Sequence, residues 1–343
     1  MKKFIETLKN CWKIEDLRQR LLITILFTAI YRFGSFVVLP GINPTLLEKL
    51  QAQTKGGLMS LLDMFSGGAF SHASIFALGI MPYISASIVM QLLAVAVPYF
   101  QKMQREGESG HKKINWYTRV LTVVILLFQA PSYLLNLKVQ AGGALASGID
   151  WTTFMIPATI ILAAGSMFIL WLGERITDKG VGNGISLIIM IGIIARLPQA
   201  LIQEFSNRVS AAIGGGIVML IIEIIVLYAV VCAALLLVQG TRKIPVQYAK
   251  RVVGNKQYGG ARQYIPLKLF AANVMPIIFA QALMFIPLAI VQYSSDNTSP
   301  VLQSLMNTKS LAYNCIYVLL IVVFTYFYTA ITLNPTQMAE DMK

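Results

Sequence analysis

The residue types that most often catalyse reactions or bind metals are few in this chain and lie far apart. The three cysteines are Cys11, Cys232 and Cys315, and neither His72 nor His111 lies beside any of them. Zinc sites need such side chains at short, fixed spacings, and structural disulfides need paired cysteines. The chain also contains no HExxH or GxSxG motif. We therefore expect no catalytic residues, no metal site and no cofactor.

Two glycine-containing stretches deserve comparison with phosphate-binding loops. The first, GESGHKK at 107–113, lacks the spacing GxxxxGK followed by Ser or Thr that such a loop requires. The second, GVGNGIS at 180–186, begins an apolar helix after a short turn. Neither stretch predicts a nucleotide site.

The composition predicts a membrane protein. Apolar residues make up 56% of the 343 residues and charged residues only 13%, which is too little polar surface for a soluble domain of this size. About 20 apolar residues span a hydrocarbon core of roughly 30 Å. The chain has eight such runs, which predict an all-α polytopic fold, near residues 21–39, 76–98, 119–137, 153–173, 185–202, 214–239, 267–291 and 311–333.

The positive charges predict the orientation of these spans. With the N-terminus in the cytoplasm, 21 of the 28 lysines and arginines fall in cytoplasmic segments, 6 fall in exterior segments and Arg32 lies within a span. This bias matches the rule that cytoplasmic loops are rich in Lys and Arg. We expect a multi-pass protein whose residues 1–20 form a cytoplasmic segment.

A glycine-rich segment, residues 56–73, fits neither a span nor an ordinary loop. Its sequence GGLMSLLDMFSGGAFSHA is half apolar and carries Asp63, so it is too short and too polar to face lipid. Non-helical backbone at membrane depth is tolerated only when it is buried in protein or lines a cavity. The segment is therefore either a buried half-helix at about 56–75 or an exterior loop with an amphipathic turn.

The chain contains an internal repeat with an offset of 194 residues. IMPYISASIVM at 80–90 aligns with VMPIIFAQALM at 274–284, and the same offset places the first and third spans inside the sixth and eighth. Five spans separate the two copies, so the repeat is inverted, and such folds keep their pathway at the repeat interface. We expect Pro82 and Pro276 to kink equivalent helices.

The repeat also predicts how the chain divides. Residues 21–202 form one half of five helices, and residues 203–343 form an incomplete second half of three helices. The partners of the fourth and fifth spans are expected near 347–367 and 379–396, beyond the printed sequence.

Five stretches closely resemble the SecY family of protein-conducting channels. They are SGGAFSHASIFALGIMPYISASI at 66–88, EGESGHKKINWYTR at 106–119, GERITDKGVGNGISLII at 173–189, IPVQYAKR at 244–251 and YFYTAITLNPTQMAEDMK at 326–343. The resemblance covers essentially the whole chain, and the family has ten helices, in agreement with an inverted repeat of five.

The resemblance implies an hourglass pore between two halves, closed by an aliphatic ring and a short plug. By motif, the ring residues are Ile80, Ile84, Ile189 and Ile278. The plug corresponds to the glycine-rich segment, with Leu61, Leu62, Asp63, Met64, Phe65, Ser66, Gly67, Gly68, Ala69 and Phe70.

The resemblance also implies a lateral gate formed by the second, third, seventh and eighth spans. Polar side chains on the gate helices could form interhelical hydrogen bonds, which are worth roughly 0.6–2 kcal/mol in lipid. They could equally be ordinary packing contacts. The candidates are Ser87, Gln91, Gln129, Asn273 and Gln281.

A basic segment at 240–268 predicts a cytoplasmic hairpin with a docking role. It carries seven basic residues and no acidic one, and its alternating runs flank a GNK turn. In the family this loop docks the ribosome and the motor ATPase SecA; a loop that only fixes the orientation is the alternative. The basic residues are Arg242, Lys243, Lys250, Arg251, Lys256, Arg262 and Lys268.

The function implied by the resemblance is translocation of unfolded secretory polypeptides across the bacterial plasma membrane, with lateral release of transmembrane segments into the bilayer. The implied partners are SecE, SecG, SecA, the ribosome, signal peptides, nascent chains and the phospholipid bilayer.

Two other functional classes fit parts of the sequence. A secondary transporter also has inverted repeats and buries charges along its path, where this chain offers only Arg32 and Glu223 well inside spans. An intramembrane protease needs a nucleophile and base or a metal at membrane depth, and both histidines lie in polar segments. The residues alone leave channel and transporter open, and the role of Glu223 is unexplained.

Overall fold

The computed structural model describes most of the chain. The described residues are 12–43, 63, 66–140, 150–209, 216–247, 251–253, 256–258, 262–272, 275–277, 279–280, 283–284 and 310–332.

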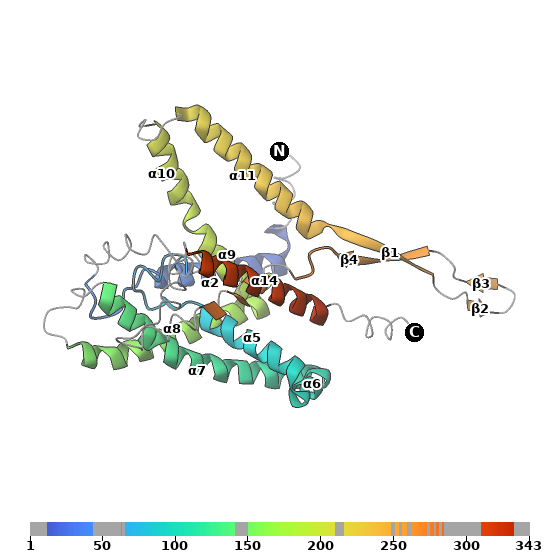
Figure 1. Ribbon diagram of the computed structural model, residues 1–343, viewed down its shortest axis with the longest axis horizontal. Coiled ribbons are helices and arrows are strands. Elements are labelled where there is room, and N and C mark those ends of the chain that lie inside the picture. The colour runs from blue at the N-terminus through green and yellow to red at the C-terminus, as the bar shows by residue number, and fades with distance from the viewer. Residues whose placement is uncertain are drawn as a thin grey trace. The chain divides into compact units, whose positions relative to one another are not determined.

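The described chain is built mainly of helices, with β-strands between residues 241 and 268 (Figure 1). In chain order the elements are α2 (Glu15–Gly34), α5 (Met81–Ala96), α6 (Pro98–Arg105), α7 (Glu108–Gln140), α8 (Trp151–Lys179), α9 (Gly184–Ile194), α10 (Leu197–Val209), α11 (Gly216–Gln239), β1 (Thr241–Gln247), β2 (Arg251–Val253), β3 (Lys256–Tyr258), β4 (Arg262–Lys268) and α14 (Leu311–Thr332).

Five helical stretches among the described residues are long and apolar enough to cross a membrane. A bent pair, Met81–Ala94 with Pro98–Gln104, makes a sixth if it counts as one span. These stretches correspond to six of the eight predicted spans, while the predicted span 267–291 lies mostly outside the described residues. The five are Glu108–Leu135, Thr153–Lys179, Gly184–Arg208, Val218–Gln239 and Leu311–Ala330.

The helix at the first predicted span, 21–39, lies closer to the N-terminus than predicted and is less apolar than expected. The helix there, α2, begins at Glu15 and ends at Gly34, and it is not among the stretches that meet the membrane-crossing criteria. After Gly34 the chain leaves the helix because its backbone pairs with a distant loop. The N–H of Leu39 donates to the carbonyl of Ala73 at 2.9 Å, and that of Ile75 donates to Val37 at 2.9 Å.

The predicted kink at Pro82 is also wrong. Pro82 lies in the first turn of α5, where proline is tolerated because its missing N–H would have no helical partner. Residues 76–80, predicted as part of this span, form turns instead. The bend lies at the other end of α5, where the break before Pro98 turns the chain by 102°.

The chain folds as two compact units, Met1–Ala200 with Ala282–Ile316 and Leu201–Gln281 with Tyr317–Lys343. The predicted division at residue 202 stays a prediction. In the first unit, α7 packs against α5 and α8, and α8 packs against α9. A Cβ added at Gly184 would lie 2.0 Å from the carbonyl oxygen of Gly173, so this glycine permits the close approach of α8 and α9.

The core of the first unit joins the loop that precedes α5 to the helices α7 and α8. Aromatic rings extend it toward α2, where Tyr31 stacks on Phe76 at 6.3 Å and Phe76 stacks on Phe168 at 5.9 Å. Its buried members are Leu39, Ile42, Phe70, Ala73, Ala77, Leu78, Leu126, Ala130, Tyr133, Leu134, Leu137, Phe154, Ala158 and Leu162.

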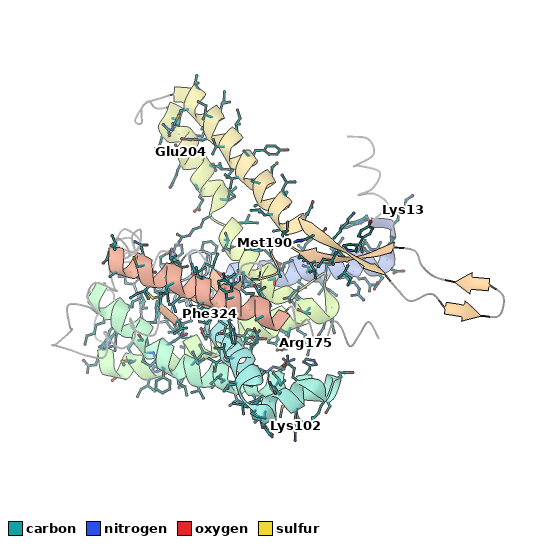
Figure 2. All side chains as sticks on the ribbon, turned by 45° about the vertical axis from the view of Figure 1, so that its right-hand side comes forward. Lys13, Lys102, Arg175, Met190, Glu204 and Phe324 are labelled. Carbon is teal, nitrogen blue, oxygen red and sulfur yellow. The ribbon has the colours of Figure 1, made fainter. Side chains whose placement is uncertain are left out.

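In the second unit, α11 exposes apolar side chains on all sides (Figure 2). None of its most apolar window is buried inside the chain, as expected of a helix surrounded by lipid. Directly after α11, β1 pairs antiparallel with β4 and β2 pairs antiparallel with β3, as in a hairpin, while its cytoplasmic location stays a prediction. The N–H of Leu269 donates to the carbonyl of Gly240 at 3.0 Å and closes the base of the ladder.

Candidate functional site

The described part of the glycine-rich segment is a buried, non-helical loop. All of residues 66–71 and Ala73 are buried, and His72 is half-buried. Asp63, at 3% exposure, is the one buried charged side chain in the part of the chain that the structure describes. Burial argues against an exterior loop, which would expose its polar groups to water. Residues 66–73 form turns, however, and not the predicted half-helix.

The loop satisfies much of its own backbone. The carbonyl of Asp63 accepts from the N–H of Gly68 at 2.9 Å and from the hydroxyl of Ser66 at 3.1 Å. The same hydroxyl oxygen accepts from the N–H of Phe70 at 3.1 Å. Such closed turns reduce the cost of burying irregular backbone.

The carboxylate of Asp63 has two partners. One oxygen forms an ion pair with Nη2 of Arg196, in the turn between α9 and α10, and the other accepts from the N–H of Ser71 at 2.9 Å. Nη2 of Arg196 also donates to the hydroxyl of Ser71 at 3.1 Å. One guanidinium therefore holds both ends of the loop.

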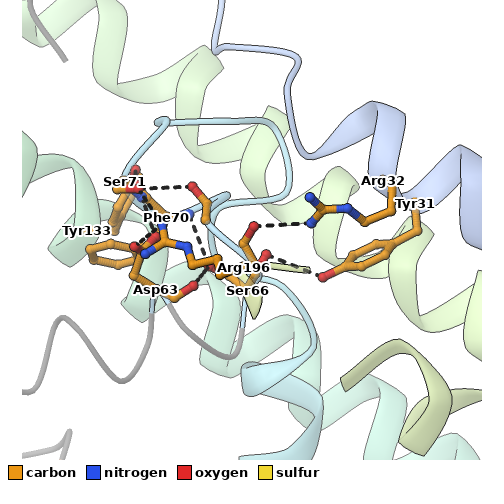
Figure 3. Close-up of polar contacts among 10 residues, drawn as sticks. Tyr31, Arg32, Asp63, Ser66, Phe70, Ser71, Tyr133 and Arg196 are labelled. Carbon is orange, nitrogen blue, oxygen red and sulfur yellow. Dashed lines mark hydrogen bonds and ion pairs between the residues drawn. The ribbon is translucent and has the colours of Figure 1, made fainter. Parts of the chain in front are cut away.

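Helix α2 holds the middle of the loop. Nη1 of Arg32 donates to the carbonyl of Gly67 at 3.1 Å, and the hydroxyl of Tyr31 donates to the carbonyl of Ser66 at 3.4 Å. Figure 3 shows the loop between these two residues on one side and Tyr133 on the other. Arg32, which the sequence placed inside a span, therefore has a defined partner.

Helix α7 holds the far side of the loop. The hydroxyl of Tyr133 donates to the carbonyl of Phe70 at 2.9 Å, and the two rings meet edge to face at 4.7 Å between centroids. Both side chains are buried. A single tyrosine thus combines a polar and an apolar contact with the loop.

Two adjacent glycines allow the side chains of Arg32 and Arg196 to approach the backbone of the loop. Gly67 and Gly68 have φ of 65° and 95°, a conformation that other residues rarely adopt. A Cβ at Gly67 would lie 2.8 Å from Nη1 of Arg32, and one at Gly68 would lie 3.0 Å from Nη2 of Arg196.

His72 does not contribute a charge to this cluster at neutral pH. Burial lowers the pKa of its imidazole, an effect that outweighs the opposite influence of Asp63.

Three of the four predicted ring residues are described, and they lie on two helices of the first unit. Ile80 and Ile84 lie one turn apart at the start of α5, where the N–H of Ile84 donates to the carbonyl of Ile80 at 3.1 Å. They are 6% and 8% exposed, and Ile189 on α9 is half-buried. Ile278 lies outside the described residues, so the convergence of the four stays a prediction.

The predicted gate residues are described only in the first unit. Ser87 and Gln91 lie one turn apart on α5, with Nε2 of Gln91 3.4 Å from the hydroxyl of Ser87. Gln129 is half-buried on α7, which packs against α5. Asn273 and Gln281 lie outside the described residues.

The predicted docking residues follow the strand ladder. Arg242 and Lys243 on β1 and Lys268 on β4 are exposed. The backbones of Arg251, Lys256 and Arg262 lie in β2, β3 and β4, and Lys250 lies outside the described residues.

The structure pairs Glu223, which the sequence left without a role. Its carboxylate on α11 forms an ion pair with Nη2 of Arg208 on α10, whose Nε also bonds Glu204 at 2.8 Å. The Arg208 side chain is only 11% exposed, so this pair joins two helices of the second unit.

Sequence reasoning missed Tyr31, Tyr133 and Arg196 as contacts of the loop. One signal could have indicated the last of them. In the predicted orientation, Arg196 is one of the six exterior positive charges, against the overall bias, and Asp63 lies on the same side. Two opposite charges on one face of the membrane are candidates for a pair.

Comparison with known sequences identifies relatives over nearly the whole chain. The family model described as SecY matches residues 74–343. Protein translocase subunit SecY of Aquifex aeolicus strain VF5 is 40% identical over 341 residues, which are 98% of this chain and 79% of that protein. The same subunit of Thermotoga maritima is 39% identical, over 98% of this chain and 78% of that protein.

Solved structures share the fold at lower identity. The structure of a protein conducting channel has a TM-score of 0.61 and 19% identity, covering 95% of this chain and 76% of that chain. Sec61 in the canine ribosome-channel complex has a TM-score of 0.60 and 18% identity, with the same coverage. A SecY structure concerned with the plug domain, which stabilises the closed channel and maintains a membrane seal, has a TM-score of 0.57 and 18% identity over 95% and 75%.

The contact between Tyr133 and the loop can be tested by Tyr133→Phe. The phenylalanine keeps the ring contact but removes one of two hydrogen bonds to the carbonyl of Phe70, whose other donor is the N–H of Ala73 at 3.2 Å. We expect the position of the loop in the structure to become less stable by about 0.5–1.5 kcal/mol relative to positions in which it has left this site. A cysteine introduced by Ala69→Cys should then react about two to ten times faster with a water-soluble maleimide.

The native cysteines are replaced by serine in this experiment. The matched control is Tyr326→Phe, which removes the hydroxyl of a tyrosine that is 76% exposed on α14. Equal reaction rates in the Tyr133 variant and the control would contradict a role for this hydrogen bond.

Proposed function

This chain belongs to the SecY family, and we propose that it forms the protein-conducting channel through which unfolded secretory polypeptides cross the bacterial plasma membrane. The observation that carries this proposal is 40% identity to a SecY translocase subunit over 98% of the chain. The helical fold, with several stretches long enough to cross a membrane, agrees with it.

The passage is closed by the aliphatic ring of Ile80, Ile84, Ile189 and Ile278. Aliphatic side chains offer no hydrogen bonds to hold a passing polypeptide, and an empty constriction of this kind excludes water. The burial of Ile80 and Ile84 supports this role, because an open, water-filled path would expose them.

The glycine-rich segment is the plug that seals the resting channel. Its burial and its contacts with α2 and α7 support this role. The proposal is made by analogy with the SecY structure of TM-score 0.57, whose plug domain maintains a membrane seal.

The lateral gate releases apolar segments into the bilayer. Ser87, Gln91 and Gln129 are its polar residues on the first half, and Asn273 and Gln281 are those on the second. Such side chains stabilise a closed gate through interhelical hydrogen bonds and are free to separate when an apolar segment enters.

The basic hairpin docks the partner that drives transport. The exposed Arg242, Lys243 and Lys268 near the base of the ladder support this role. Cationic side chains bind RNA phosphates or acidic protein surfaces, so the ribosome and SecA are the partners, together with the subunits SecE and SecG. A Sec61 structure from a ribosome-channel complex supports the first of these partners.

The N-terminus and the hairpin lie on the cytoplasmic side of the plasma membrane. The excess of lysine and arginine in the segments assigned to that side supports this orientation. The relatives from Aquifex and Thermotoga are bacterial proteins.

A transport assay tests the proposed function. The chain is reconstituted in proteoliposomes with its partner subunits and the motor, and the entry of a secretory precursor is measured beside the uptake of small solutes. A channel of this family moves the precursor and no solute. Solute uptake driven by a proton or sodium gradient, without precursor transport, would support the secondary transporter instead.

The double variant Ile84→Gly with Ile278→Gly tests the ring. Glycine removes the apolar wall at two positions related by the repeat, so we expect a higher ion conductance of the resting channel in planar bilayers. The control replaces Ile156 and Ile160, which are 69% and 62% exposed on α8, with glycine. Unchanged conductance in the ring variant would count against the ring.

Charge reversal at Lys250 and Arg251 tests the docking role. We expect Lys250→Glu with Arg251→Glu to weaken ribosome binding and to lower the slope of log affinity against log salt by about 2, one for each lost phosphate contact. The same reversal at Lys2 and Lys3 is the control, since it changes the net charge equally. Binding that equals the control would remove this role.

A further inference from the structure

The contact between Asp63 and Arg196 differs from the other contacts of the glycine-rich segment. The carboxylate side chain is 4% exposed and the arginine side chain is 45% exposed. The carboxylate has lost almost all of its hydration, and the guanidinium keeps part of its own. Arg196 approaches from the turn after α9, so the pair connects the segment to a distant element of the same unit.

We infer that the ion pair between Asp63 and Arg196 is the latch that holds the plug closed, and that a translocating polypeptide opens the channel by separating this pair. The inference rests on the proposed function, because only a channel requires the segment to leave its site.

The energetics of a buried ion pair suit a reversible latch. The cost of removing two charges from water offsets much of their attraction, so the pair is favourable only in one geometry. When the segment leaves, both groups regain water. Separating a purely apolar contact would instead cost free energy in proportion to the apolar area that becomes exposed to water.

The remaining polar contacts cannot replace this pair. Arg32 and Tyr133 donate to the backbone carbonyls of Gly67 and Phe70, which every sequence would offer at these positions. Among the described side chains of the segment, only the carboxylate of Asp63 contacts both Ser71 and Arg196. A single substitution can therefore remove the latch and leave the other contacts in place.

The test measures how often the segment opens. The full-length chain, assembled with its partner subunits in proteoliposomes, carries Ala69→Cys, and its native cysteines Cys11, Cys232 and Cys315 are changed to serine. Ala69 is 1% exposed, so a maleimide added on both sides reacts with the new cysteine only when the segment leaves its site.

Two single variants and their combination define the latch. Arg196→Gln leaves a buried carboxylate without its counter-charge, so alkylation should be roughly a hundredfold faster. Asp63→Asn keeps an acceptor for the N–H of Ser71 and leaves a half-exposed arginine that water can solvate, so the increase should be roughly tenfold. The double variant should resemble Asp63→Asn, because it no longer buries an unpaired carboxylate.

The matched control is Arg208→Gln, which breaks the ion pair with Glu223 in the other unit. We expect it to leave the alkylation rate unchanged. Rates equal to the control in both single variants, or effects that simply add in the double variant, would overturn the latch. If Arg196→Gln does not assemble, Asp63→Asn decides alone, and an alkylation rate equal to that of the control would overturn the latch.

Precursor transport by the cysteine-containing parent is measured in the same proteoliposomes. Absence of transport would reject the proposed function, whereas the alkylation rates report on the ion pair independently. The two failures are therefore distinguishable.

Discussion

Irregular backbone inside a membrane protein needs a partner for every polar group, and this constraint shapes the first unit. A buried N–H or C=O without a hydrogen bond costs several kcal/mol where water is absent. The loop at 66–73 meets this requirement partly by its own turns and partly through side chains of α2 and α7. Its position is therefore determined by directional bonds, and apolar packing fills the space around them.

The same constraint explains where the neighbouring elements end. Helix α2 ends at Gly34, shortly after Tyr31 and Arg32, and the chain then runs beside the loop so that Val38 pairs with Ser74. Gly34 has no side chain where the ring of Phe76 approaches, since a Cβ there would lie 2.1 Å from that ring. The helix and the loop thus fit one another at the level of single residues.

The sequence predicted well those helices whose limits depend on local composition. Helix α11 runs from Gly216 to Gln239 where 214–239 was predicted, and α14 runs from Leu311 to Thr332 where 311–333 was predicted. A helix that faces lipid needs only length and apolar side chains. The end of α2 depends on a backbone pairing with residues 73–75, which no local pattern indicates.

The sequence predicted the buried segment of the candidate site but not the residues that contact it. The glycine-rich composition and the isolated Asp63 indicated a buried segment, because such residues do not fit a lipid-facing helix. The partners Tyr133 and Arg196 lie far from it along the chain, and a tyrosine or arginine alone indicates no partner. Charge placement hinted at Arg196, whereas nothing in the sequence distinguished Tyr133 from the other tyrosines.

Two of the ion pairs in the described chain, Glu223 with Arg208 and Asp63 with Arg196, show why such a protein retains charges at all. Helix α11 exposes apolar side chains on every side, so contact with lipid does not determine its register against α10. The ion pair of Glu223 with Arg208 determines that register. The loop is not helical, so helical hydrogen bonds do not determine its position, and the pair of Asp63 with Arg196 does so instead. Buried pairs add little net stability but depend strongly on geometry. In a channel, where one arrangement must hold until a polypeptide displaces it, that dependence on geometry is the useful property.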